Sequence, residues 1–237
     1  MADRSLFCVM TTCHNDRIYL QNQLPQLLEV ADKIVIVDDF SSDGTLEYVE
    51  GLNNSKVEFY QRQFDCCAKQ FDFALQKLPK GNVWVLNMTA IELPTNYFFE
   101  NIRNVLDESD KRDIDRIWMS VFHLRGERTM CQETGGELRL FRNGVENENK
   151  FSGYPHECID GKYYGYGLPE VDREFAFVRF RQASKEKIRE WLEDYVEKGI
   201  YSLWDLKRRL DYPTVELPMF INYKINDELR KHLGWTN

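Results

Sequence analysis

Residues 33–45, KIVIVDDFSSDGT, decide the fold of this chain. The first five residues form a short apolar, β-branched run, which predicts a strand buried on both faces of a parallel sheet. The run breaks into Asp38 and Asp39, and a Ser/Asp/Gly turn follows. Because ligands of parallel α/β sheets collect beyond the carboxyl ends of the strands, the two aspartates are candidate ligand contacts. The other interpretation is structural, since Ser, Asp and Thr oxygens also cap helices.

The same stretch resembles the nucleotide-sugar loop of the family-two glycosyltransferases, which have the GT-A fold and carry V-D-D-x-S-x-D-G-T after their second strand. The resemblance implies that Asp38 or Asp39, with Ser41 in the same loop, binds the uracil or ribose of a nucleotide diphosphate sugar. It also implies that the loop after the first strand packs against base and ribose, where Thr11 is a matching position. For Thr11 the structural alternative is a simple strand end.

Length and composition limit the number of domains and the kinds of partner to expect for this chain. The 237 residues suit one α/β domain with a small helical appendage. The resemblance implies that residues 1–175 bind nucleotide sugar and acceptor, and we expect residues 176–237 to form a helical extension packed on the same domain. A hydrophobic content of 43% is ample for a core. The net charge of −8 counts against nucleic acid and anionic membranes as partners.

Sequence patterns also bear on location. No uncharged apolar stretch approaches the roughly 18 residues that a membrane-spanning helix needs. The first residues show no signal-peptide pattern, so we expect a cytoplasmic protein. The six cysteines include no C-x-x-C pair, which favours reduced, structural thiols.

Short apolar runs alternate with helical periodicity along the first half of the chain. This alternation predicts an α/β fold with a Rossmann-like, mostly parallel, doubly wound sheet, in line with the GT-A fold. The expected strands are residues 6–10, 33–37, 57–60, 84–86 and 116–124, and the expected helices are residues 18–31, 46–52, 64–78 and 96–106.

The helix expected at residues 64–78, FDCCAKQFDFALQKL, resembles a segment of the lipopolysaccharide-core and peptide-glycosylating branch of the family. There the helix faces the nucleotide, so the resemblance implies that Asp65 and Lys69 contact it. For Lys69 the structural alternative is an exposed charge on an amphipathic helix.

Residues 82–94, NVWVLNMTAIELP, match the family pattern W-V-L-x-L-D-A-D-E-x-L-P almost position for position, with one large departure. The two aspartates that hold the divalent cation in the family are Thr89 and Ile91 here, which leaves only Glu92. A hard cation such as manganese or magnesium requires carboxylate oxygens. The diphosphate charge therefore needs Lys or Arg side chains, a helix N-terminus, or a cation held elsewhere.

Three alternatives follow from this departure. The chain is a metal-independent transferase, a transferase with relocated metal ligands, or a protein that has kept the fold without catalysis. For relocated ligands, Glu92 and His156 are the candidates. Thr89 and Glu92 stay candidates for the phosphate or acceptor side.

A second block of resemblance joins residues 137–143, ELRLFRN, to residues 151–159, FSGYPHECI, which match R-L-F-R-N and F-x-G-x-x-H-E-x-I. An inverting transfer needs a base that takes the acceptor's proton, and Glu157 is the candidate. His156 is a candidate for binding the diphosphate or a cation, or for orienting Glu157. Arg142 is a candidate phosphate partner. The structural alternatives are a buried polar pair and a surface ion pair.

Two functions from different classes remain open. The first is a glycosyltransferase that moves a sugar from a nucleotide diphosphate sugar, such as a UDP sugar, to an unidentified small molecule, glycan or protein. The second is a catalytically inactive GT-A-fold protein that binds nucleotide or serves as a scaffold. In the tail we expect helices at residues 184–198, 202–210 and 226–233, and Trp235 suggests docking or a homodimer contact.

Overall fold

The computed structural model describes residues 4–144, 150–152, 158–160, 174–180, 215–219 and 221–235. The expected helices at residues 184–198 and 202–210 lie outside the described residues. The described elements are β1 (Leu6–Cys13), α1 (Arg17–Val30), β2 (Lys33–Asp38), α2 (Thr45–Gly51), β3 (Val57–Gln61), α3 (Cys67–Gln76), β4 (Val83–Thr89), β5 (Glu92–Pro94), α4 (Asn96–Lys111), β6 (Arg116–Gly126), β7 (Thr129–Arg142), β8 (Lys150–Ser152), β9 (Cys158–Asp160), β10 (Phe177–Arg179), β11 (Val215–Glu216) and α7 (Asp227–His232).

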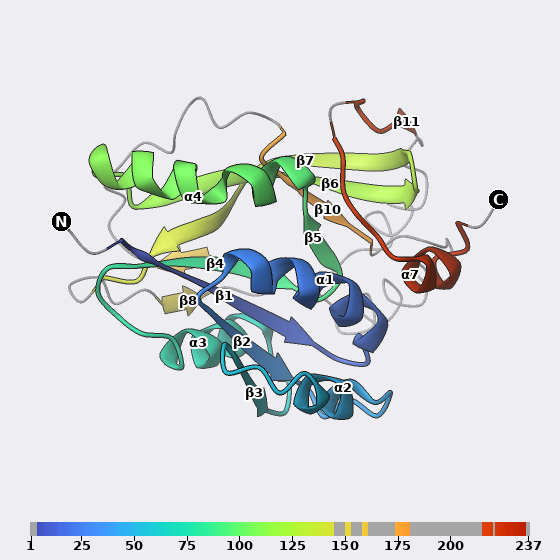
Figure 1. Ribbon diagram of the computed structural model, residues 1–237, viewed down its shortest axis with the longest axis horizontal. Coiled ribbons are helices and arrows are strands. Elements are labelled where there is room, and N and C mark those ends of the chain that lie inside the picture. The colour runs from blue at the N-terminus through green and yellow to red at the C-terminus, as the bar shows by residue number, and fades with distance from the viewer. Residues whose placement is uncertain are drawn as a thin grey trace.

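The main sheet has the strand order β3-β2-β1-β4-β7-β6-β10-β5, with β11 paired to β7 (Figure 1). β1 pairs in parallel with both β2 and β4, and β2 pairs in parallel with β3. β7 enters antiparallel between β4 and β6, whereas β10 runs parallel to β6. The predicted α/β class, with a parallel sheet in its N-terminal half, is confirmed.

The strand order reverses at β1. The chain moves outward from β1 to β2 and β3, then returns to place β4 on the other side of β1. Such a reversal leaves a crevice beyond the carboxyl ends of the two strands that flank it, and open α/β sheets bind ligands there. Here the two strands are β1 and β4, so their carboxyl ends define the place to look for a site.

Helices cover both faces of the sheet because side chains of a strand alternate between faces. Phe7 and Val9 of β1 belong to the apolar cluster formed with α1 and α4, which lie in front of the sheet in Figure 1. Cys8 and Met10 belong to the cluster formed with α3 on the other face. The sheet is therefore doubly wound, as predicted.

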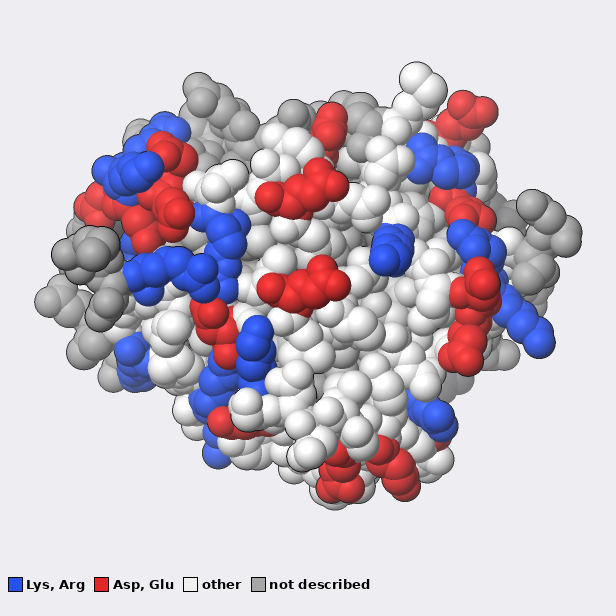
Figure 2. Space-filling model, in the orientation of Figure 1, with Lys and Arg blue, Asp and Glu red and all other residues white. Residues whose placement is uncertain are grey.

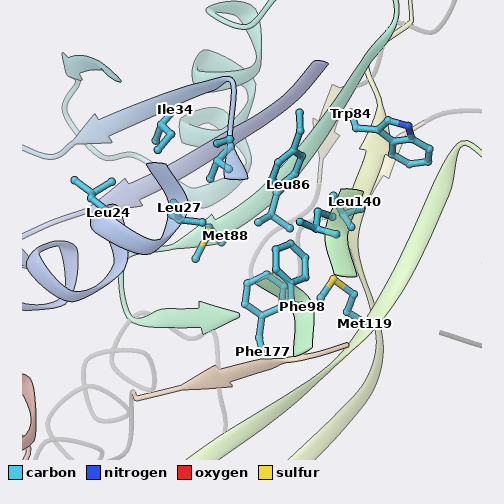
Figure 3. Packing of buried hydrophobic residues seen from close by; sticks show 14 of the residues in the cluster. Leu24, Leu27, Ile34, Trp84, Leu86, Met88, Phe98, Met119, Leu140 and Phe177 are labelled. Atoms are coloured by element: carbon cyan, nitrogen blue, oxygen red, sulfur yellow. The ribbon is translucent and has the colours of Figure 1, made fainter. Parts of the chain in front are cut away.

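The larger cluster is centred on Phe98 of α4. Figure 3 shows Phe98 and Phe177 facing Leu86 of β4 and Leu140 of β7. The Phe98 ring is fully buried and lies 4.7 Å from the ring of Phe175 and 6.1 Å from that of Phe177, measured between centroids. These contacts join the N-terminal half of the chain to the strand that enters the sheet late in the sequence.

Two helix starts show how side chains set the boundaries. α4 begins as expected, because the hydroxyl of the N-cap residue Thr95 accepts a hydrogen bond from the Phe98 amide at 3.3 Å. α3 begins at Cys67 rather than at residue 64. Residues 62–66 instead form a loop in which Arg62 holds the Asp65 carboxylate, and this loop becomes part of the candidate site.

The described parts of the chain after residue 174 add two strands, β10 and β11, to the same sheet and pack a helix, α7, on the domain. β10 lies between β6 and β5, and α7 packs beside α1. Trp235 docks within the chain, with its ring centroid 6.1 Å from that of Phe180. None of the helices in the described ranges has the length and apolar character needed to cross a membrane.

Truncating Phe98 to alanine is expected to lower the free energy of unfolding by about 3–5 kcal/mol, because it opens a cavity where the two halves of the chain meet. The matched control is Met219→Ala, since Met219 is 90% exposed and its truncation should change stability by no more than about 0.5 kcal/mol. Urea denaturation followed by circular dichroism measures both. Equal effects of the two substitutions would contradict this account of the core.

Candidate active site at the carboxyl edge of the sheet

The candidate site is the set of loops that follow the carboxyl ends of β1, β2, β3 and β4. Residues 14–16 follow β1, residues 39–44 follow β2, and residues 62–66 follow β3. Hydrogen bonds join the first loop to the second and the second to the third. The site therefore has a rigid floor at the point where the sheet topology predicts ligand binding.

Asp38 closes its own loop. Its carboxylate is fully buried and accepts hydrogen bonds from the Ser41 amide at 2.9 Å, from the Ser41 hydroxyl, and from Gln61 Nε2 at 3.3 Å. The Cys13 thiol donates to the same carboxylate at 3.4 Å. Both carboxylate oxygens of Asp38 accept hydrogen bonds from groups within the protein. Asp38 and Ser41 therefore shape the loop and are not placed to bind a ligand.

Asp39 is the aspartate that reaches the surface. Its side chain is 27% exposed, and Oδ1 accepts a hydrogen bond from the Phe64 amide at 2.8 Å. His14 Nδ1 donates to the Asp39 carbonyl oxygen at 2.7 Å and lies 3.6 Å from Oδ2. Asp39 therefore presents Oδ2, flanked by His14, as an acceptor on the surface of the site.

Asn15 locks the first loop to the second. Its backbone adopts φ of 56°, a left-handed conformation that asparagine tolerates better than most residues. In this conformation the Asn15 amide donates to Ser41 Oγ and its Oδ1 accepts from the Ser42 amide, both at 2.8 Å. Sequence reasoning selected neither Asn15 nor His14. The available signal was the polar stretch of residues 14–16, H-N-D, directly after a strand.

Thr11 lies inside the sheet and not at its edge. β1 continues to Cys13, and Thr11 is paired between Ile36 of β2 and Met88 of β4. The Thr11 side chain is fully buried, and its hydroxyl has no hydrogen-bond partner among the described residues. A direct side-chain contact with a ligand, as the resemblance implied, does not fit this position.

Asp65 and Lys69 lie at the rim of the same edge. Arg62 binds the Asp65 carboxylate through both terminal nitrogens at 2.9 and 3.1 Å, and Lys69 Nζ lies 2.9 Å from it. Hydrogen bonds from Arg62 and Lys69 hold the pKa of Asp65 well below its usual range. The structure thus binds Lys69 to Asp65, the residue after Phe64, whose amide donates to Asp39. It adds Arg62, which sequence reasoning missed.

The turn after β4 is fixed by Glu92. The Thr89 amide donates to Glu92 Oε2 at 2.9 Å. Glu92 is fully buried and accepts hydrogen bonds from Arg139 at 2.7 and 3.1 Å and from Arg179 Nε at 2.7 Å. Burial alone would raise the pKa of Glu92, but Arg139 and Arg179 lower it to about 2.

These contacts bear on the metal question. A cation bound by Glu92 would have to displace two arginines from a buried position. This geometry does not fit the expectation that Glu92 is a metal ligand. Within the described ranges, no group of three or more His, Cys, Asp or Glu side chains is arranged to hold a metal ion. The geometry assigns Glu92 to an ion-pair network.

Arg142 lies at the opposite edge of the sheet. Because β7 is antiparallel to β4, Arg142 pairs with Trp84 near the start of β4, and its guanidinium contacts Asp110 and Asn82. Trp84 and Thr89 are five residues apart along a strand, roughly 16 Å. The expectation that Arg142 faces a phosphate does not fit this placement. Arg139 is the arginine of the same strand that reaches the carboxyl edge.

His156 and Glu157 lie outside the described residues, and their roles remain predictions. β8 and β9, which flank them in sequence, pair antiparallel. β8 packs on α3, where the ring centroids of Phe151 and Phe71 are 5.2 Å apart.

Ionisation of the Asp16 carboxyl, in the first loop, is unfavourable in the folded protein. It accepts a hydrogen bond from the His14 amide at 3.0 Å. Burial raises the pKa of Asp16 from 3.8 to about 6, and the negative charges of Asp43 and Asp38 add to this shift. Asp43 shows the reverse: burial opposes ionisation there, but hydrogen bonds from Thr45 and the Arg17 amide lower its pKa.

We expect Asp16→Asn to stabilise the protein near neutral pH. A carboxyl whose pKa is raised on folding destabilises the folded state at pH values above its folded pKa, so the penalty is present above about pH 6 and vanishes as the pH falls toward 4. The gain in unfolding free energy at pH 7.5 should be about 1–2 kcal/mol, because each pKa unit corresponds to about 1.4 kcal/mol. Thermal unfolding from pH 4 to pH 8 measures it.

Asp43→Asn is the matched control and should lower stability at pH 7.5, because the Asp43 carboxylate accepts hydrogen bonds from Arg17 and Thr45. If Asp16→Asn destabilised the protein at every pH, the Asp16 carboxylate would stabilise the folded state, and this electrostatic account would be wrong.

Comparison with known proteins places the fold. No protein-family model matches the sequence, and no curated relative does. The structure is similar to the crystal structure of S. aureus TarS, with a TM-score of 0.50 and 14% identity, over 81% of this chain and 40% of the TarS chain. A second crystal structure, S. aureus TarS 1–349, gives 0.49 and 15%, over 81% of this chain and 65% of that chain.

This chain therefore spans less than two thirds of the length of either match. TarS is a glycosyltransferase, and at these identities the likeness concerns the fold alone. The chain has a glycosyltransferase-like, Rossmann-type α/β fold of the kind that the resemblance to the GT-A fold implied.

Proposed function

We propose that this protein is a glycosyltransferase that moves a sugar from a nucleotide diphosphate sugar to an acceptor, with inversion at the anomeric carbon. The observation that carries the proposal is the carboxyl edge of the sheet. There hydrogen bonds fix His14, Asn15 and Asp39 beside the point where the strand order reverses. His14 donates to the Asp39 carbonyl oxygen, Asn15 is bonded to Ser41 and Ser42, and the Phe64 amide donates to the Asp39 carboxylate. The glycosyltransferase-like fold supports it.

Asp39 is the proposed contact for the nucleoside. Its Oδ1 is used by the Phe64 amide, so Oδ2 is the oxygen that would accept a hydrogen bond from a base N–H or a ribose hydroxyl. Phe40 and Phe64 are 57% and 41% exposed beside it and offer flat apolar faces suited to a planar base. Asp38, Ser41 and Thr11 would support this loop from below, with Asp65 and Lys69 at its rim.

We propose that donor binding needs no divalent cation. Thr89 and Ile91 supply no carboxylate, and Glu92 is committed to Arg139 and Arg179. Two guanidinium groups at the same edge offer an alternative source of positive charge for a diphosphate.

For the chemical step we propose Glu157 as the base, with His156 orienting it or binding the diphosphate. The acceptor oxygen attacks the anomeric carbon while its proton passes to Glu157, and the bond from that carbon to the diphosphate oxygen breaks. The support is the sequence resemblance of residues 151–159.

The acceptor is proposed to be a small molecule, a glycan or a protein. On the face shown in Figure 2, the described Lys and Arg side chains lie beside Asp and Glu side chains and form no continuous basic stripe. Together with the net charge of −8, this counts against a nucleic-acid acceptor.

A second function has a specific observation in its favour. Both carboxylates of the family's cation motif are replaced, and the carboxylate that remains, Glu92, is bound to arginines. A protein that binds nucleotide without transferring sugar would show the same features. Substrate turnover separates the two functions.

Calorimetric titration with UDP, GDP and TDP, each with manganese and with a chelator, tests the proposal. We expect saturable binding of one nucleotide that is unchanged by the chelator and at least tenfold weaker in Asp39→Asn. Asp107→Asn, an exposed carboxylate on α4, is the control and should bind normally. Absence of binding of all three nucleotides under both conditions would overturn the proposal.

Release of the nucleoside diphosphate from a panel of nucleotide sugars then distinguishes enzyme from binding protein. Turnover that is lost in a folded Glu157→Gln variant, with nucleotide binding retained, is the expected result. Binding without turnover across the panel would favour the inactive alternative.

A further inference from the structure

Arg139 and Arg179 form a layered charge cluster at the carboxyl edge. Beneath them lies Glu92, which is fully buried, and above them lies Glu137, whose side chain is 30% exposed. The arginine side chains between the two carboxylates are 7% and 16% exposed. The exposure of the side chains thus increases in order from the inner carboxylate to the outer one.

Glu92 fixes the geometry of the two arginines. Its Oε1 accepts from Arg139 Nη2 at 2.7 Å and from Arg179 Nε at 2.7 Å, and its Oε2 accepts from Arg139 Nη1 at 3.1 Å. The Arg139 guanidinium carbon also lies 5.4 Å from the centre of the Phe177 ring. Two like charges are held side by side because one buried carboxylate binds both.

The outer side of this pair already binds an oxyanion. A single oxygen, Glu137 Oε2, accepts from Arg139 Nη2 at 2.5 Å and from Arg179 Nη2 at 3.2 Å. Two converging guanidinium groups on one oxygen match the way that proteins bind phosphate oxygens.

The cluster lies where a diphosphate would need charge. Leu140 of β7 pairs with Leu86 of β4. Glu137 is three residues before Leu140 and Thr89 is three residues after Leu86, so both lie toward the carboxyl edge of the sheet. Asp39 follows β2, three strand positions from β7 in the sheet, which corresponds to roughly 14 Å. An extended nucleoside diphosphate has a comparable length.

We propose that the outer face of Arg139 and Arg179 is a binding site for a phosphate oxyanion, and that Glu137 occupies it as an internal stand-in until a diphosphate displaces it. The inference rests on the proposed function for the identity of the diphosphate as part of a sugar donor. Glu137 is the member of the cluster suited to leave, since it is the most exposed, whereas Glu92 stays to hold the arginines.

Calorimetric titration with inorganic pyrophosphate, in the presence of a chelator, tests this site. Glu137→Gln keeps the shape of the side chain but removes the competing charge, so it should bind pyrophosphate and UDP about three- to tenfold more tightly than wild type. Arg179→Lys keeps one positive charge toward Glu92 but loses the planar fork, and should bind at least tenfold more weakly. Uridine, which has no phosphate, should bind all variants equally.

Glu58→Gln is the matched control, because Glu58 is also a partly exposed carboxylate bound to a cation. Its Oε1 lies 2.7 Å from Lys33 Nζ, on the other half of the sheet from the arginine cluster. It should leave pyrophosphate affinity unchanged. Circular dichroism and thermal unfolding establish that each variant is folded, and if Glu137→Gln is not, the result for Arg179→Lys decides.

The outcomes separate the two proposals. Tighter binding of pyrophosphate in Glu137→Gln, without any nucleotide preference, supports the oxyanion site and contradicts the proposed sugar donor. Nucleotide binding with pyrophosphate affinity unchanged in both Glu137→Gln and Arg179→Lys supports nucleotide binding and overturns the oxyanion site.

Discussion

The structure depends on one buried carboxylate, Glu92, and its two ion pairs with Arg139 and Arg179. A carboxylate with no exposed surface is stable as a charge only when cations and hydrogen-bond donors surround it. Here the donors come from β7, from β10 and from the backbone at the end of β4. One side chain therefore joins strands that are far apart in sequence, and removal of either arginine would cost about 3–5 kcal/mol.

This interaction also divides the candidate site into two halves. The loops after β1, β2 and β3 carry the hydrogen-bonded group of Asp39, His14 and Asn15, which suits a nucleoside. The ends of β4, β7 and β10 carry arginines and their carboxylates, which suit phosphate charge. In this view the absence of aspartates at Thr89 and Ile91 and the presence of Arg139 and Arg179 are two parts of one arrangement.

The sequence predicted the strands of the parallel half, β1 to β4, and the edge that carries the site, because an apolar run that ends in Asp38 and Asp39 is a local feature of the sequence. It did not predict which aspartate is buried. That outcome depends on contacts with Gln61 and Phe64, which come from the next strand and its loop. Local patterns therefore located the loop, and tertiary contacts assigned the roles within it.

The placement of the arginines could not be read from the sequence either. Arg142 and Arg139 are three residues apart, and only the register of β7 against β4 decides which of them reaches the carboxyl edge. Arg179 lies 87 residues from Glu92, so no local spacing connects them. The match to R-L-F-R-N contains both arginines, but it does not indicate the direction in which this segment enters the sheet.

A crystal structure of the protein with UDP, or with whichever nucleoside diphosphate binds, grown in a chelator, tests the central claim most directly. The account predicts the base or ribose at Asp39, diphosphate oxygens on Arg179 and Arg139, Glu137 displaced outward, and Glu92 unmoved beneath them. A diphosphate bound away from the arginines, or a requirement for a cation bridging the diphosphate to carboxylates, would contradict it.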